Sequence, residues 1–396
     1  MHHYPRVFTV IQSKNSNHLP KPDPAAAAHS EKVKQHILAE IREHGSIPFA
    51  RFMELALYAP GLGYYSAGAH KFGAGGDFVT APEISPLFSR CLARQCQQVL
   101  AEIPDSDILE LGAGTGIMAA DILLELEKLN TLPSHYYILE ISAELKQRQQ
   151  ALLQQKIPHL INRVTWLESL AHFKMCGIVI ANEVIDALPI YKFKMTHQLQ
   201  EFSVTEDNGE FIWKLTEPDH LLAQQVAKLN ISLPENYESE INLMLQSWLA
   251  AISDVLTQGV VLLMDYGFPR HEYYHPDRSM GTLMCHYRHH AHSDPLILVG
   301  IQDITAHVDF THVAEAAEEA KLTVAGYTTQ ANFLLSCDIT ALAHSDDDFQ
   351  QLQYNQQIKK LLLPNEMGEL FKVIALTRNL NIPLQGFNLY DMCHKL

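Results

Sequence analysis

Residues 108–121 read ILELGAGTGIMAAD, a short apolar stretch that runs into three alternating glycines and then into a helical pattern. Side chains at Gly112, Gly114 and Gly116 would keep a ligand away from the turn, so glycine at these positions lets backbone N–H groups reach the ligand. The alternative is a glycine turn that only lets a helix pack closely. The stretch favours a strand–turn–helix unit with a ligand at the turn.

A second apolar stretch, residues 136–141, carries an acid, Glu140, near its end. Glu140 lies 24 residues beyond Gly116, and an acid that closes the strand after a glycine turn can accept hydrogen bonds from ribose hydroxyls. The glycines and Glu140 together predict a site for a cofactor that carries a nucleoside.

The glycine spacing decides which cofactor is expected. A dinucleotide fold requires G-x-G-x-x-G, but Ile117 occupies the position of its third glycine, and no G-K-S/T sequence follows to grip a triphosphate. The turn is G-x-G-x-G, and it resembles motif I of class I S-adenosylmethionine methyltransferases. In that motif the acid before the first glycine, here Glu110, lies beneath the methionine end of the cofactor. A nicotinamide dehydrogenase is the least favoured reading.

Composition excludes some partners. The chain has 396 residues with 29 Lys and Arg against 45 Asp and Glu, a formal charge of −16, so no overall basic surface is expected and nucleic acid is not predicted as a substrate. An acidic surface favours a cationic partner, although it can also serve solubility alone. No run of 18 apolar residues exists, so no membrane span is predicted.

The six cysteines form no C-x-x-C pair, which fits a reducing compartment. The first 29 residues contain no continuous apolar segment of the kind that directs secretion. These features predict a bacterial cytoplasm, with the mitochondrial matrix as the alternative.

Two helices are expected near the start of the chain. Ser30 can cap the first, which Gly45 ends, and the second follows Pro48 and stops at Pro60. Residues 61–82 are irregular and rich in glycine, and this length is too great for a simple connector. They are therefore a candidate lid.

The centre of the chain alternates strands and helices, which predicts an α/β fold with a seven-stranded, doubly wound sheet. Helices are expected from Thr115, from Ala143 to Leu153, and over 311–321. The expected strands are 108–111, 136–141, 164–167, 177–181, 260–265, 322–327 and 371–377.

The gap between the fourth and fifth strands is far longer than a crossover needs, so it holds an insertion. Alternating apolar residues flank Asn208-Gly209, which predicts a hairpin, and helical spacing follows from Ile241 to Val255. The expected units are a flexible tail at 1–29; a helical module and lid at 30–105; a methyltransferase core at 106–190, 258–330 and 369–396; a hairpin and helix insertion at 191–257; and a helical insertion at 331–368.

The fourth strand ends in the sequence ANEVIDALP, residues 181–189. Ligands of an open α/β sheet bind beyond the carboxyl ends of its strands, so Asn182, Glu183 and Asp186 should meet the glycine turn. The same polar residues could instead form an ordinary helix cap.

Six ordered segments together resemble the MidA-like family, which includes the mitochondrial methyltransferase that assists respiratory complex I assembly. These segments are GGDFVTAPEISPLF at 75–88, ELGAGTG at 110–116, ANEVIDALP at 181–189, LMDYG at 263–267, QDITAHVDF at 302–310 and MGELFKV at 367–373. The resemblance implies an S-adenosyl-L-methionine-dependent protein arginine methyltransferase whose partner is a protein substrate, with a complex I subunit as the candidate.

Methyl transfer to arginine needs groups that orient a guanidinium and manage the loss of its proton, and carboxylates do both. Glu183 is the first candidate for this role, Asp186 the second and Asp265 the third, while a turn or cap role is as probable for the last two. Asn182 is expected to hold the substrate or the methionine part of the cofactor.

The resemblance also places Thr80, Glu83 and Ser85 near the cofactor or substrate. In the candidate lid, Tyr64, Tyr65 and Phe78 could face the sulfonium or simply pack, and Gly75-Gly76-Asp77-Phe78 could close over the cofactor. Four histidines between His286 and His292 have no spacing that suits a zinc ion, so no metal is predicted and a polar loop beside the substrate groove is expected, in which Arg288 pairs with an acid.

Three functions remain open from the sequence. The first is arginine methylation of a protein, the second is methylation of a small molecule, and the third is a non-catalytic assembly factor that keeps the cofactor fold. A homodimer is possible, and the identity of the acceptor is left open.

Overall fold

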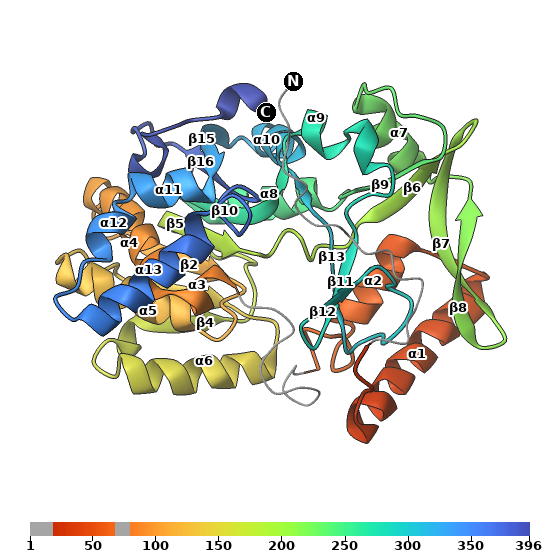
Figure 1. Cartoon of the computed structure of the whole chain (residues 1–396), viewed down its shortest axis with the longest axis horizontal. Coiled ribbons are helices and arrows are strands. Elements are labelled where there is room, and N and C mark those ends of the chain that lie inside the picture. The colour runs from red at the N-terminus through yellow and green to blue at the C-terminus, as the bar shows by residue number, and fades with distance from the viewer. Residues whose placement is uncertain (1–18, 68–79) are drawn as a thin grey trace.

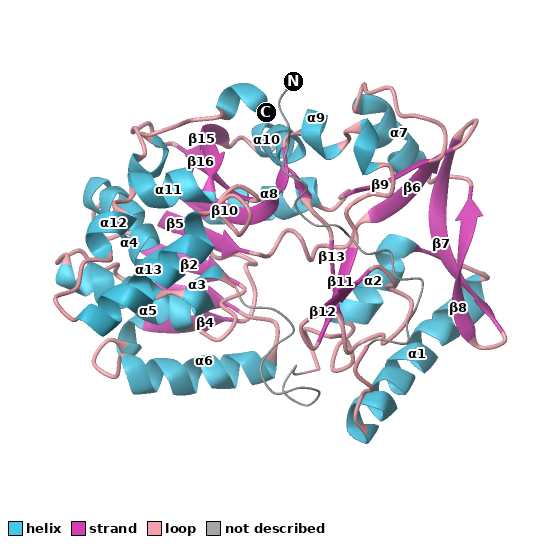
Figure 2. Ribbon diagram, viewed as in Figure 1, coloured by secondary structure: helices cyan, strands magenta, loops and turns pink. Residues whose placement is uncertain are grey.

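The computed structural model describes residues 19–67 and 80–396. A large sheet with helices on both faces forms one part of the molecule, and α1, α2 and two smaller sheets form the other (Figures 1 and 2). The order of the large sheet is β15 (Thr323–Thr329), β16 (Phe371–Arg378), β10 (Leu256–Phe268), β5 (Met175–Asn182), β2 (Asp107–Leu111), β3 (Tyr136–Leu139) and β4 (Val164–Leu167).

These seven strands correspond to the seven that the sequence predicts. The short β14 (Val308–Asp309) also pairs with β10 and brings the sheet to eight strands. Its two residues are too few to leave a periodic signal in the sequence.

The strand directions locate the point where ligands are expected. β4, β3, β2, β5 and β10 run parallel to one another, whereas β16 lies antiparallel to β10 and to β15. From β2 the chain crosses first to β3 on one side and later to β5 on the other. The crevice between the carboxyl ends of β2 and β5 is therefore the switch point of the sheet.

Strand residues alternate between two cores, one on each face of the sheet. Ile108 and Ile178 lie in the first core, while their neighbours Leu109 and Val179 lie in the second. The first core also contains residues of α4 (Pro86–Glu102), α5 (Ile117–Lys128), α6 (Ala143–Lys156), α11 (Gln330–Ser336), α12 (Ile339–Leu342) and α13 (Asp348–Leu362). The second contains residues of α8 (Leu245–Val255) and α10 (Phe310–Glu319).

The smaller part holds two further sheets. One has the order β1 (Ile47–Pro48), β7 (Leu199–Asp207), β6 (Tyr191–Met195) and β9 (Tyr237–Ile241), with β8 (Glu210–Thr216) on β7. The other has the order β12 (His290–His292), β11 (Met284–Tyr287) and β13 (Asp303–Thr305). A separate core joins them to α1 (Pro24–His44) and α2 (Phe49–Tyr58). The remaining elements are α3 (Ala81–Ile84), α7 (His220–Lys228), α9 (Arg270–Tyr273), η3 (Ile161–Arg163), η4 (Pro276–Arg278), η5 (Gln385–Phe387) and η6 (Cys393–Lys395).

The hairpin that Asn208 and Gly209 predict is present as β7 and β8. The predicted cap at Ser30 is wrong, because α1 begins at Pro24 and Asp23 accepts the N–H groups of its first turn. Six residues of the expected flexible tail are therefore helical.

The helical spacing from Ile241 spans two different elements. Ile241 ends strand β9, and α8 begins four residues later at Leu245. α8 packs on α10 in the second core of the large sheet, so it covers the methyltransferase sheet although the sequence assigned it to the insertion. In the same way, α4 packs on α5 rather than on the N-terminal helices.

Candidate functional site

The glycine turn and the Asn182 segment leave neighbouring strands at the same edge. Leu111 of β2 pairs with Ala181 of β5, so Gly112 and Asn182 are the next residues on adjacent parallel strands. A Cβ on Gly112 would lie 3.3 Å from Cγ2 of Val184. The structure therefore brings these two predicted segments into contact.

The three glycines are required for different reasons. All have positive φ, with values of 67° at Gly112, 53° at Gly114 and 88° at Gly116, a conformation that glycine adopts without strain. A Cβ on Gly114 would meet no atom within 4 Å, whereas one on Gly116 would lie 3.3 Å from Gln149. Only Gly114 faces open space. A Cβ on Gly112 or Gly116 would meet protein, and the expectation that all three glycines let a ligand lie against the turn stays a prediction.

Glu140 follows β3, and three donors hold its carboxylate, one of them the backbone N–H of Ile141. Its Oε1 accepts from the backbone N–H of Ser142 at 2.9 Å, and its Oε2 accepts from Nε2 of Gln149 at 2.9 Å. Burial raises the pKa of Glu140, and these hydrogen bonds oppose the rise. Gln149 could not be selected from the sequence, because a polar residue in a helix carries no signal of its own.

Glu110 lies beneath the turn and is almost fully buried. Tyr136 donates its hydroxyl to Oε2 at 2.8 Å, while Oε1 accepts no hydrogen bond from the described residues. Burial raises the pKa of Glu110 to about 7. A buried carboxylate oxygen that accepts no hydrogen bond costs free energy, so Oε1 of Glu110 is suited to accept a hydrogen bond from a ligand.

Glu183 has an unusual backbone. Its φ is 52°, which is uncommon for a residue with a side chain, and its N–H donates to the carbonyl of Met264 at 2.9 Å. Burial and then the neighbouring Asp186 raise the pKa of Glu183 to about 8. Asn182 donates to Oε1 of Glu183 at 3.2 Å, and Oδ1 of Asn182 accepts nothing within the described part of the chain.

Asp186 is buried four positions beyond Asn182. The hydroxyl of Tyr266 donates to its Oδ2, and burial raises its pKa to about 6 despite this bond. Its Oδ1 is free of partners among the residues described. Tyr266 belongs to the segment LMDYG, but its contact with Asp186 joins distant parts of the chain and could not be predicted from that segment.

Asp265 has a structural role. Its Oδ2 accepts from the backbone N–H groups of Ile185 at 3.0 Å and of Asp186 at 3.2 Å, and its Oδ1 accepts from Tyr266 at 2.9 Å. These three bonds fix the loop that presents Asp186. The turn role, one of the two that the sequence left open, is the one that these contacts support.

The short helix α3 connects the two sides of the crevice. Thr80 precedes it, the N–H of Ala81 donates to the carboxylate of Glu183, and Glu83 accepts from the hydroxyl of Thr115 in the glycine turn. Thr80 and Glu83 thus lie beside the site. Ser85 caps α4 instead, accepting from Leu87 at 3.2 Å.

The described aromatic residues of the candidate lid, Tyr64 and Tyr65, pack against other side chains. Tyr65 stacks on Tyr58 with ring centroids 5.5 Å apart, Tyr64 meets Tyr65 edge to face at 5.0 Å, and Tyr65 donates to Asp303 at 2.8 Å. The packing alternative therefore describes Tyr64 and Tyr65. Residues 75–78, which include Phe78, lie outside the described residues.

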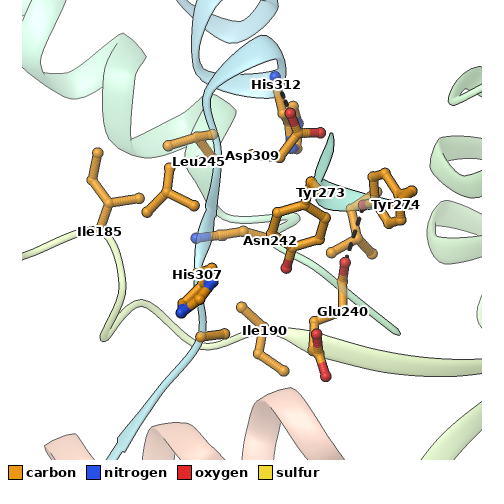
Figure 3. Close-up of a pocket in the computed structure, with 13 residues that line it drawn as sticks. Ile185, Ile190, Glu240, Asn242, Leu245, Tyr273, Tyr274, His307, Asp309 and His312 are labelled. Atoms are coloured by element: carbon orange, nitrogen blue, oxygen red, sulfur yellow. Dashed lines mark hydrogen bonds between the residues drawn. The ribbon is translucent and has the colours of Figure 1, made fainter. Parts of the chain in front are cut away.

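A small cavity lies behind the site, between the loop of Ile185 and Ile190 and the segment that carries His307 and His312 (Figure 3). Its volume of about 20 Å³ suits one water molecule. Burial lowers the pKa of His307 to about 3, so this ring is neutral. The cavity is too small for a nucleoside.

The histidine-rich segment forms the β11–β12 hairpin, and Arg288 at its turn pairs with Asp23 at 3.0 Å, which confirms the expected ion pair. Within residues 19–67 and 80–396, no three His, Cys, Asp or Glu side chains are placed to hold a metal ion. Among the helices of the described ranges, none is long and apolar enough to cross a membrane.

The crevice fits a nucleoside-bearing cofactor that donates hydrogen bonds. Gly114 faces open space, and Glu140 follows the neighbouring strand β3. Two buried oxygens, Oε1 of Glu110 and Oδ1 of Asn182, accept no hydrogen bond from the described residues and can accept one from a ligand. A sheet of this order with G-x-G-x-G at its switch point defines a class I S-adenosylmethionine-dependent methyltransferase.

Comparison with known proteins agrees with this class. Residues 91–328 match the family described as "Putative S-adenosyl-L-methionine-dependent methyltransferase". The chain belongs to that family, and its sequence places it in the MidA-like group. Its cofactor is S-adenosyl-L-methionine.

Two solved structures from Burkholderia thailandensis are similar over almost the whole chain. One, bound to S-adenosyl-homocysteine, is 42% identical with a TM-score of 0.91, and it covers 96% of this chain and 100% of its own. The other, a native crystal structure, is 40% identical with a TM-score of 0.89 over the same shares.

Curated relatives are more distant. The mitochondrial protein arginine methyltransferase NDUFAF7 of Danio rerio is 27% identical, covering 89% of this chain and 88% of its own length. The Bos taurus protein of the same name is 28% identical, covering 89% and 85%.

Proposed function

We propose that this methyltransferase modifies an arginine on a protein substrate. The observation that carries the proposal is the pair of carboxylates, Glu183 and Asp186, beside the glycine turn. Within residues 19–67 and 80–396, neither forms an ion pair with a Lys, Arg or His side chain. Two clustered acids without a cation favour a positively charged ligand, and a planar guanidinium suits them because it offers paired donors.

The shifted pKa values support an acid–base role for the same residues. The pKa values of about 8 for Glu183 and about 6 for Asp186 bracket neutral pH, where a proton acceptor works best. When bound, the cofactor supplies an electrophilic methyl group on sulfur. The bound guanidinium, a cation beside Glu183, favours the ionised form of this acid. The carboxylate then orients the guanidinium so that one nitrogen faces the methyl carbon, and it accepts the proton that this nitrogen must lose.

The cofactor residues are part of the proposal. Glu140 accepts from the ribose hydroxyls, Gly114 leaves room for the cofactor, and Glu110 and Asn182 accept from its methionine end. Thr80 lies beside the sulfonium. Gly112 and Gly116 complete the turn against which the cofactor lies, and a Cβ on either would also meet protein.

The acceptor protein is proposed from the relatives. The names of the curated relatives describe protein arginine methyltransferases of mitochondria. The acceptor we propose here is likewise a protein arginine, and the family resemblance points to a subunit of respiratory complex I.

Methyl incorporation tests the proposal. Purified enzyme, labelled S-adenosyl-L-methionine and a cell extract should yield a labelled protein band whose hydrolysate contains methylarginine. The Glu183→Gln variant, with cofactor binding intact, should label nothing. Label found only in a small-molecule fraction would contradict the proposal and support methylation of a small molecule. Cofactor binding without transfer of label to any acceptor would support a non-catalytic assembly factor.

A further inference from the structure

Gln149 is a fully buried polar residue on α6, and its side-chain amide makes three hydrogen bonds at the crevice. Nε2 donates to the carbonyl of Gly114 at 3.0 Å and to Oε2 of Glu140 at 2.9 Å. Oε1 accepts from Nε1 of Trp166 at 2.9 Å. One amide thus joins the glycine turn, the acid after β3 and the end of β4.

The orientation of this amide is fixed by its partners. The indole N–H of Trp166 can only donate, so it must face the oxygen of Gln149. The NH₂ group is then turned toward two acceptors, the carbonyl of Gly114 and the carboxylate of Glu140. Neither a flipped amide nor a carboxylate at position 149 could satisfy all three partners.

We infer that Gln149 is a positioning residue for the cofactor, because it orients Glu140 toward the ribose and holds Gly114 at a fixed distance from that acid. The inference rests on the proposed role of Glu140. The bonds from Gln149, from Ser142 and from the backbone N–H of Ile141 leave acceptor capacity on the carboxylate of Glu140 for a ribose hydroxyl.

The packing at Gly116 supports the same role. A Cβ on Gly116 would lie 3.3 Å from both Cα and Cγ of Gln149. The third glycine therefore lets α6 approach closely enough for the amide of Gln149 to reach the turn.

A pair of matched variants tests the inference. Gln149→Glu preserves the size of the side chain and its acceptor for Trp166, but near neutral pH it places a second carboxylate against Glu140. Gln150→Glu makes the same change at the next, exposed position of α6. The dissociation constant for S-adenosyl-homocysteine is measured by calorimetry for both variants and for the wild type, near pH 7 and near pH 5.

The expected result is specific in size and in pH. Gln149→Glu should weaken binding by roughly 10-fold to 100-fold near pH 7, the loss expected when a buried hydrogen bond to a charged group is replaced by repulsion. Relative to the wild type, most of the loss should disappear near pH 5, because the paired carboxylates then share a proton that can be donated between them. Gln150→Glu should bind as the wild type does. A purely structural defect would not recover on acidification.

A double-mutant cycle separates action through Glu140 from other effects. Gln149→Leu should cost much less affinity in a Glu140→Gln background than in the wild type. Equal losses in both backgrounds, no loss from Glu140→Gln alone, or equal affinities of Gln149→Glu and Gln150→Glu near pH 7 would each overturn the inference. None of these results bears on the proposed arginine methylation, which the incorporation of labelled methyl groups tests separately.

Discussion

Glu183→Gln should stabilise the cofactor-free protein while it abolishes turnover. Glu183 directly follows β5 with a positive φ and lies beside Asp186, and its pKa is raised from the ordinary 4.5 to about 8. Glutamine has nearly the same shape and can still accept from Ala81, but it carries no charge. The substitution therefore removes the free-energy cost of a buried ionisable group while it preserves the volume of the side chain.

The magnitude follows from the pKa. Between pH 4.5 and about pH 8, the folded protein keeps a proton on Glu183 that the unfolded chain has released, so wild-type stability falls as pH rises through this window. At about 1.4 kcal/mol per pH unit, the loss by pH 7 amounts to at most roughly 3 kcal/mol. The variant avoids this loss, so we expect a gain of up to about 3 kcal/mol near pH 7 and none near pH 4.

Urea unfolding of the cofactor-free protein across this pH range measures the effect. Glu366→Gln, at an exposed glutamate, is the matched control and should follow the wild type at every pH. Binding of S-adenosyl-homocysteine should survive in Glu183→Gln, and methyl transfer should fall by roughly 100-fold or more, as expected for loss of a general base. The reasoning fails if the stability difference is independent of pH, or if turnover persists.

Three further outcomes are expected. Gly114→Val should abolish thermal stabilisation by S-adenosyl-homocysteine. Gly209→Val, at a hairpin glycine with equally open surroundings and positive φ, is the control and should retain this stabilisation. Equal behaviour of the two variants would refute binding of the cofactor at Gly114. Tyr266→Phe removes a hydrogen bond that lowers the pKa of Asp186, so the pKa of Asp186 should rise and the acidic limb of the pH–rate profile should move to higher pH. If this limb does not move, Asp186 has no role in catalysis. Asp265→Ala should lower the free energy of unfolding by about 1–3 kcal/mol, because three backbone N–H groups lose the side-chain oxygens that accept from them; a smaller loss in denaturant titration would contradict the anchoring role.

Much of the fold could be predicted from local patterns. The strand before Gly112 and the hairpin at Asn208 each depend on residues that are neighbours in the chain, so periodicity and turn residues were sufficient. The N-terminus of α1 and the position of α8 were missed. Ser30 was a possible cap, but tertiary packing extended α1 to Asp23, and the stripe from Ile241 joined a strand to a helix.

The sequence by itself determined the family, the cofactor and the two segments, 110–116 and 181–189, that meet at the switch point, because parallel strands with short apolar signals bring their carboxyl ends to one edge. Only the tertiary structure decided how the acids differ. Asp265 anchors a loop, Asp186 receives the hydroxyl of Tyr266, and Glu140 is held by Gln149. These contacts join residues up to 80 positions apart, and burial sets the pKa of each acid, so neither spacing nor composition carries that information.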